Sequence, residues 1–147
     1  VFTGDALFVS GCGNFNTGTP AQMASAFQRL GKLPMNTFVW AGHEYTVSNL
    51  AYACFVEPES KLLRAKTEWA KAQVASKAFT VPSTIQEEHE MNPFMRAVYG
   101  VDVLVKHCGT DNPVRAIKFV REEKSSGSWK MTKLNPLPTK CVRASPI

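Results

Sequence analysis

The hydrophobic pattern of this chain changes its period near residue 44, and that change constrains the fold more than any other feature. Before it, short apolar runs at 1–3, 6–9 and 38–41 have the length of buried strands, and the segment 20–30 has helical spacing. Strand, helix, strand is the order found in layered α/β sheets. After residue 44, apolar residues recur every three or four positions, which predicts a run of helices.

Capping residues and helix breakers set the expected limits of the helices. Thr19-Pro20 begins the first helix and Gly31 ends it, whereas Gly11-Cys12-Gly13 is predicted to be a loop. Five further helices are predicted, beginning at Thr46, at Ser60, at a capping box over Ser83 to Gln86, at Val98 and at Asn112. The helix that follows Ser60 is expected to bury Leu62, Leu63, Trp69, Ala70 and Val74.

These patterns predict two domains and a tail. Residues 1–43 are expected to form the trailing part of an α/β domain, and residues 44–124 a helical domain. Residues 125–147 are rich in Ser, Pro and Lys and are expected to be disordered. That tail carries four of the five net positive charges, Lys130, Lys133, Lys140 and Arg143, and leaves the rest near +1. A nearly neutral body argues against nucleic-acid binding.

Other features of the composition narrow the class of protein. No apolar stretch is long enough to cross a membrane. The four cysteines, Cys12, Cys54, Cys108 and Cys141, are far apart, which favours reduced thiols over disulfides or a thiolate zinc site. The chain begins without methionine, so we expect a processed or truncated N-terminus.

Asp5 and His43 stand out because each follows an apolar strand beside a glycine. Residues at strand ends in α/β sheets project into the crevice where ligands bind. The pair could be metal ligands or an acid–base pair, or Asp5 could cap a turn and His43 bind a backbone carbonyl. The two other histidines have structural interpretations: His89 is expected on a solvated helix face, and His107 near a helix C-terminus.

Two cations and a tyrosine are further candidates. Arg121 and Lys124 are three residues apart and share one helix face, which suits a carboxylate ligand but is also usual at a solvated helix end. Tyr45 follows His43 closely, so its ring faces either the same crevice or the helical domain. Trp69 is expected in the core.

Several motifs together resemble one enzyme family. FTGDALFVSGCG, AGHEYTVSNLAYA, VEP, VPSTIQEE, NPFMR and VREEK, in this order, look like the C-terminal portion of glyoxalase II, or hydroxyacylglutathione hydrolase. The resemblance covers about residues 1–124. It implies a metallo-β-lactamase-like αββα domain followed by an all-α domain that binds glutathione.

The resemblance also implies a metal site and a reaction. Asp5 matches the aspartate that bridges two metal ions, usually zinc and sometimes iron or manganese, and His43 matches a histidine ligand of one of them. The remaining ligands belong to an upstream histidine motif, so we expect this chain to be a fragment that is inactive alone. The implied reaction is hydrolysis of S-(2-hydroxyacyl)glutathione, typically S-D-lactoylglutathione, to glutathione and D-lactate.

Substrate contacts are implied at two places. Tyr45, Arg121 and Lys124 match family residues that bind glutathione. The loop Asn14, Phe15, Asn16 matches a glutathione-contacting stretch, but it lacks the basic residue and the second aromatic ring common there.

Alternatives to a glyoxalase II enzyme stay open. They are a non-catalytic glutathione-binding or interaction protein of the same fold, and another hydrolase or a dioxygenase of the superfamily. The expected molecule is a monomer without nucleic-acid or membrane partners, located in the cytoplasm or in mitochondria.

Overall fold

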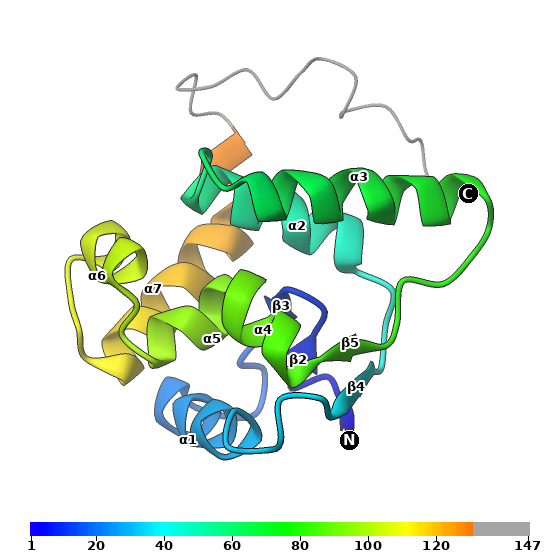
Figure 1. Ribbon diagram of the computed structural model, residues 1–147. Helices are drawn as coiled ribbons and strands as arrows, with labels where there is room; N and C mark the ends of the chain where they lie inside the picture. Colours follow the sequence, from blue (N-terminus) through cyan, green and yellow to red (C-terminus); the bar gives the residue numbers. More distant parts are fainter. Residues whose placement is uncertain (131–147) are drawn as a thin grey trace.

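The computed structural model describes residues 1–130, a helix-rich fold with little sheet (Figure 1). The strands are β1 (Phe2–Gly4), β2 (Leu7–Phe8), β3 (Gly11–Cys12), β4 (Phe38–Ala41) and β5 (Ser83–Thr84). The helices are α1 (Pro20–Leu30), α2 (Thr46–Val56), α3 (Lys61–Ala75), α4 (Ile85–Met91), α5 (Pro93–Val98), α6 (Asp102–Cys108) and α7 (Pro113–Ser126), followed by the 3-10 turn η1 (Ser128–Lys130). None of the helices described is long and apolar enough to cross a lipid bilayer.

The strands form two small sheets. In the first, β1 pairs in parallel with β4, and β4 pairs antiparallel with β5. In the second, β2 and β3 form an antiparallel pair with Leu7 opposite Cys12. The predicted loop at Gly11-Cys12-Gly13 is therefore wrong for Gly11 and Cys12, which are buried strand residues. Pairing with β2 satisfies backbone groups that a loop would leave to water.

Side-chain caps start five of the seven helices within residues 1–130, and three of these caps, at α1, α3 and α7, lie where the sequence predicts them. Thr19 and Gln22 form a capping box at α1, and the side chain of Asn112 accepts hydrogen bonds from the first amides of α7. The box predicted over Ser83 to Gln86 lies one residue later, between Thr84 and Glu87. The prediction missed α5, whose first amides are capped by Asn92.

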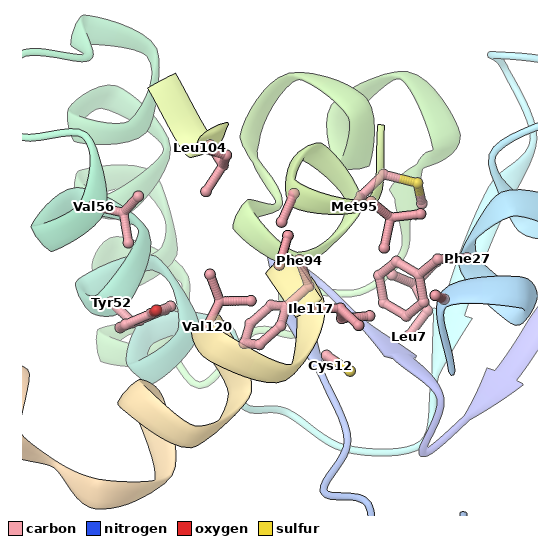
Figure 2. Packing of buried hydrophobic residues seen from close by; sticks show 14 of the residues in the cluster. Leu7, Cys12, Phe27, Tyr52, Val56, Phe94, Met95, Leu104, Ile117 and Val120 are labelled. Atoms are coloured by element: carbon pink, nitrogen blue, oxygen red, sulfur yellow. The ribbon is translucent and has the colours of Figure 1, made fainter. Parts of the chain in front are cut away.

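One hydrophobic cluster joins the β2–β3 hairpin, α1 and the later helices. Figure 2 shows Leu7 and Phe27 beside Met95 and Ile117, with Phe94 between them and Tyr52. The cluster therefore contains residues from both sides of the boundary proposed at residues 43 and 44. The division into two domains itself stays a prediction.

Helix α3 differs from the expectation. Leu63 and Ala70 are buried, but Leu62, Trp69 and Val74 are exposed. The ammonium of Lys66 lies 4.0 Å from the centroid of the Trp69 ring, so this ring covers a surface lysine instead of filling the core. In β4, likewise, only Val39 is fully buried, while Phe38 and Trp40 are exposed.

One structural expectation for histidine is wrong and the other is confirmed, since His107 lies in the last turn of α6. His89 is half-buried, not solvated: its Nε2 lies 2.9 Å from the carbonyl of Gly31, and its ring packs edge-on against Tyr99. His107 pairs with Glu123 at 2.7 Å, so a specific carboxylate faces it at the end of α6.

The predicted tail starts too early. Helix α7 continues through Ser126, and Trp129 of η1 is buried in the core cluster. Trp129 supplies the apolar surface that orders this segment. The rest of the predicted tail, including Lys133, Lys140 and Arg143, lies outside the described residues.

Candidate functional site

Asp5 and His43 meet at the ends of two parallel strands. Because β1 and β4 run in parallel, the residues that follow them emerge at the same sheet edge. His43 Nε2 lies 3.4 Å from Asp5 Oδ1, and both side chains are more than half exposed. The backbones are joined there too, since the amide of Gly42 donates to the carbonyl of Gly4 over 2.9 Å.

The turn that presents Asp5 depends on a close approach of two backbones. The amide of Gly13 donates to the carbonyl of Ala6, and a Cβ on Gly13 would lie 1.9 Å from the carbonyl oxygen of Asp5. Only glycine fits there without moving Asp5. The hairpin of β2 and β3 thus fixes one half of the pair.

Aromatic rings fix the position of His43, the other member of the pair. The His43 ring stacks on Tyr45, with centroids 5.0 Å apart and an interplanar angle of 18°, and Phe8 meets Tyr45 edge-on. Glu44 points away and binds Thr80, whose amide donates over 3.0 Å. His43 is therefore oriented by packing, with its Nε2 toward Asp5.

Arg121 and Lys124 lie on the face of α7 that turns toward the β2–β3 hairpin. Arg121 donates from Nη1 to the carbonyl of Cys12 over 2.5 Å, and from Nε to Ser125 Oγ over 3.2 Å. Lys124 donates from Nζ to Asn49 Oδ1. Both cations also lie near the ring of Phe94, at 5.2 and 5.9 Å from its centroid.

These two cations are held by neutral acceptors. Neither forms an ion pair within residues 1–130, and Arg121 is only 9% exposed. Burial, together with the charge of Arg121, lowers the pKa of Lys124 to about 8, and burial lowers the pKa of Arg121. A buried cation without a counter-ion is costly, so this face favours an anionic ligand.

A cleft of about 620 Å³ joins the two groups. Seven of the eight predicted site residues line it: Asp5, Asn14, Asn16, His43, Tyr45, Arg121 and Lys124. The eighth, Phe15, packs against the core cluster instead. Cleft residues that the sequence did not single out include Asn49, Trp129 and Lys130. One feature of the sequence could have pointed to Asn49: it is a polar residue beside Leu50 on the apolar face of α2.

Cys12 also lines the cleft, but its thiol is buried in the core cluster and does not suit nucleophilic chemistry. Burial raises its pKa to about 12, so it is protonated at neutral pH. Its carbonyl, which holds Arg121, is the part of this residue that contributes to the site.

Asp5 and His43 fit part of a metal site. A carboxylate oxygen and an imidazole nitrogen are suitable ligands for zinc, iron or manganese, and both are open to the cleft. Residues 1–130 contain no group of three or more His, Cys, Asp or Glu side chains that could hold a metal ion. This pair would therefore supply two ligands of a larger set.

The cleft holds a buried arginine and a half-buried lysine, neither paired with an acid within residues 1–130, beside a carboxylate–imidazole pair. This arrangement defines a protein that binds a small anionic ligand next to potential metal ligands. Residues 44–127 match the family described as hydroxyacylglutathione hydrolase C-terminus, and the chain belongs to this family. The resemblance found in the sequence motifs is thereby confirmed.

Curated relatives agree with this assignment. A probable hydroxyacylglutathione hydrolase of Schistosoma mansoni is 49% identical over 125 residues, which cover 84% of this chain and 51% of the relative. A hydroxyacylglutathione hydrolase-like protein of Gallus gallus is 42% identical over 94% of this chain and 48% of its own length. The cytoplasmic hydroxyacylglutathione hydrolase of Arabidopsis thaliana is 44% identical over 84% of the chain and 48% of its own. The chain spans about half the length of these relatives.

Proposed function

We propose that this chain is the glutathione-binding part of a thioester hydrolase that converts S-(2-hydroxyacyl)glutathione, such as S-D-lactoylglutathione, to glutathione and the hydroxy acid. The observation that carries the proposal is a pair of cations, the buried Arg121 and the half-buried Lys124. Neutral acceptors hold both on the cleft that also contains Asp5 and His43. Its relatives bear the name of that reaction.

Arg121 and Lys124 would bind a carboxylate of the glutathione moiety. A guanidinium grips both oxygens of a carboxylate and an ammonium adds a point charge, and burial strengthens both interactions. Tyr45, Asn14 and Asn16 line the same cleft and would contact the peptide by hydrogen bonds. Because the Phe15 side chain packs against the core cluster, this residue would contact the peptide through its backbone. Holding the thiol part in this way orients the thioester carbonyl toward Asp5 and His43.

Asp5 and His43 would hold divalent metal, with zinc the leading choice and iron or manganese as alternatives. When bound, the metal ions supply a hydroxide nucleophile near neutral pH and stabilise the oxyanion of the thioester carbonyl. We place Asp5 and His43 in a metallo-β-lactamase-like αββα domain of which residues 1–43 are the last part. We further propose a monomer with no nucleic-acid or membrane partner. A cytoplasmic location is in keeping with the name of the Arabidopsis relative.

The test is hydrolysis of S-D-lactoylglutathione by the longest form of the protein that its gene encodes, with zinc present. Asp5→Ala is expected to abolish hydrolysis. Arg121→Met is expected to raise KM about tenfold or more with little change in kcat, because a charge-assisted hydrogen bond to the thiol part is lost. Retained hydrolysis in Asp5→Ala would overturn the role of Asp5.

A non-catalytic glutathione-binding protein is the second candidate, because Arg121 and Lys124 can bind a carboxylate without the participation of Asp5 and His43. It predicts glutathione binding that depends on Arg121, with no hydrolysis by any form of the protein.

A further inference from the structure

Lys130 lies at the cleft, three residues beyond the part of the chain that matches the family's C-terminal domain. The match ends at residue 127, whereas η1 places Trp129 and Lys130 among the residues that line the cleft. Figure 1 shows η1 directly after α7, next to α2.

The position of the turn is fixed by Trp129. This side chain is 8% exposed, and its ring meets Tyr52 edge-on with centroids 5.5 Å apart. Its Nε1 donates to the carbonyl of Lys124 over 3.3 Å, and the amide of Lys130 donates to the carbonyl of Gly127 over 3.0 Å. Because Trp129 is anchored in the core, Lys130 has a defined place beside the end of α7.

Lys130 adds a third cation to a cleft with one acid. Its ammonium lies 5.5 Å from the centroid of the Trp129 ring, and its charge contributes to the lowered pKa of Lys124. Asp5 is the only Asp or Glu among the described residues that line the cleft. The electrostatic potential there favours a ligand with more than one negative group.

The three cations divide into two kinds. Arg121 is buried and Lys124 half-buried beside the Phe94 ring, and both are held by fixed acceptors, so they form one carboxylate subsite. Lys130 is exposed and rests on Trp129. We propose that Lys130 is a specificity-determining residue that binds a second carboxylate of the thiol ligand, separate from the one bound by Arg121 and Lys124.

This inference rests on the proposed function, since glutathione carries two carboxylates, one on its γ-glutamyl residue and one on its glycine. With one carboxylate at Arg121 and Lys124, the other is free to reach Lys130. A thiol peptide without the γ-glutamyl carboxylate provides no partner for Lys130. Lys130 therefore discriminates between glutathione and such a peptide.

The test is a calorimetric cycle with the full chain at low ionic strength. Glutathione is compared with 4-aminobutyryl-cysteinyl-glycine, which lacks only the γ-glutamyl carboxylate. Lys130→Ala is expected to weaken glutathione binding about threefold to fivefold, the range for one exposed ion pair, and to leave binding of the analogue unchanged. The effect should disappear in about 1 M salt, where exposed charges are screened.

Two variants provide controls. Lys118→Ala removes an exposed lysine of α7 that pairs with Glu122, and it should change neither affinity. Arg121→Met should weaken both ligands equally, which reports on the proposed function. If Lys130→Ala changes neither affinity, or both by the same factor, while Arg121→Met weakens both, the inference about Lys130 is wrong and the proposed function stands. If the unaltered chain binds neither ligand, both are overturned.

Discussion

Replacing Glu88 by Gln should make the stability of the protein less dependent on pH. Glu88 is 1% exposed, and its Oε2 accepts hydrogen bonds from the amide of Ser10 at 3.0 Å and from Asn92 Nδ2 at 2.8 Å. Its Oε1 faces the hydroxyl of Ser83. Burial raises the pKa of this carboxyl from 4.5 to about 7, against the opposing effect of these hydrogen bonds.

The direction follows from proton binding. Between pH 4.5 and about 7 the folded state holds a proton on Glu88 that the unfolded state has lost, so stability falls as pH rises through this window. Above about pH 7 both states are ionised and the loss is complete. A shift from 4.5 to about 7 corresponds to about 3 kcal/mol at pH 8, and to only about 1 kcal/mol at pH 5.

A glutamine at position 88 has the hydrogen-bonding groups and the neutral charge of the protonated Glu88 side chain. Its carbonyl oxygen accepts from Ser10 and Asn92, and its NH₂ group donates to Ser83, whose hydroxyl rotates to accept. Urea unfolding at pH 5, 6, 7 and 8 should therefore show Glu88→Gln gaining about 2 kcal/mol relative to the unaltered chain between pH 5 and pH 8.

Glu90→Gln is the matched control, because Glu90 lies on the same helix and is exposed. Its stability difference from the unaltered chain should be flat over this range. The reasoning is refuted if the difference between Glu88→Gln and the unaltered chain is equally flat.

Three further predictions concern Lys124, Asn92 and Gly13. Glutathione affinity should fall between pH 7 and pH 9, because Lys124 has a pKa of about 8 and loses its charge there, and Lys124→Met should remove this dependence in calorimetry. Asn92→Ala should destabilise the chain by about 2 to 4 kcal/mol in urea unfolding, since it removes the cap of α5 and a partner of Glu88; a loss below about 1 kcal/mol would contradict this. Gly13→Ala should abolish hydrolysis by the full-length protein while glutathione binding persists, because its Cβ displaces the backbone of Asp5; full activity would show that the turn tolerates a side chain.

The local parts of the fold were predictable from sequence. Thr19, Ser60 and Asn112 cap helices where the sequence places them, because a cap depends only on residues two or three positions away. The positions of Asp5 and His43 after two strands also follow from local pattern. Their distance of 3.4 Å depends on the parallel pairing of β1 with β4, which strand ends alone suggest but do not prove.

The buried polar contacts were not predictable, because their partners are distant in the chain. Glu88 reads as one of several acids on a short helix, yet it binds Ser10, 78 residues earlier. Asn49 binds the carbonyl of Val9, 40 residues earlier, and also accepts from Lys124. Trp69 shows the converse, since an aromatic residue at core spacing is exposed on a helix with only Leu63 and Ala70 buried.

The proposed function requires Arg121 and Lys124 to bind a carboxylate of the ligand. The most direct measurement is calorimetric titration of the full chain at pH 7 with glutathione and with its glycine ethyl ester, which lacks the charge of the glycine carboxylate. The account predicts that glutathione binds about tenfold or more tightly than the ester, and that Arg121→Met removes this difference. Equal affinities for the two ligands in the unaltered chain would contradict the claim.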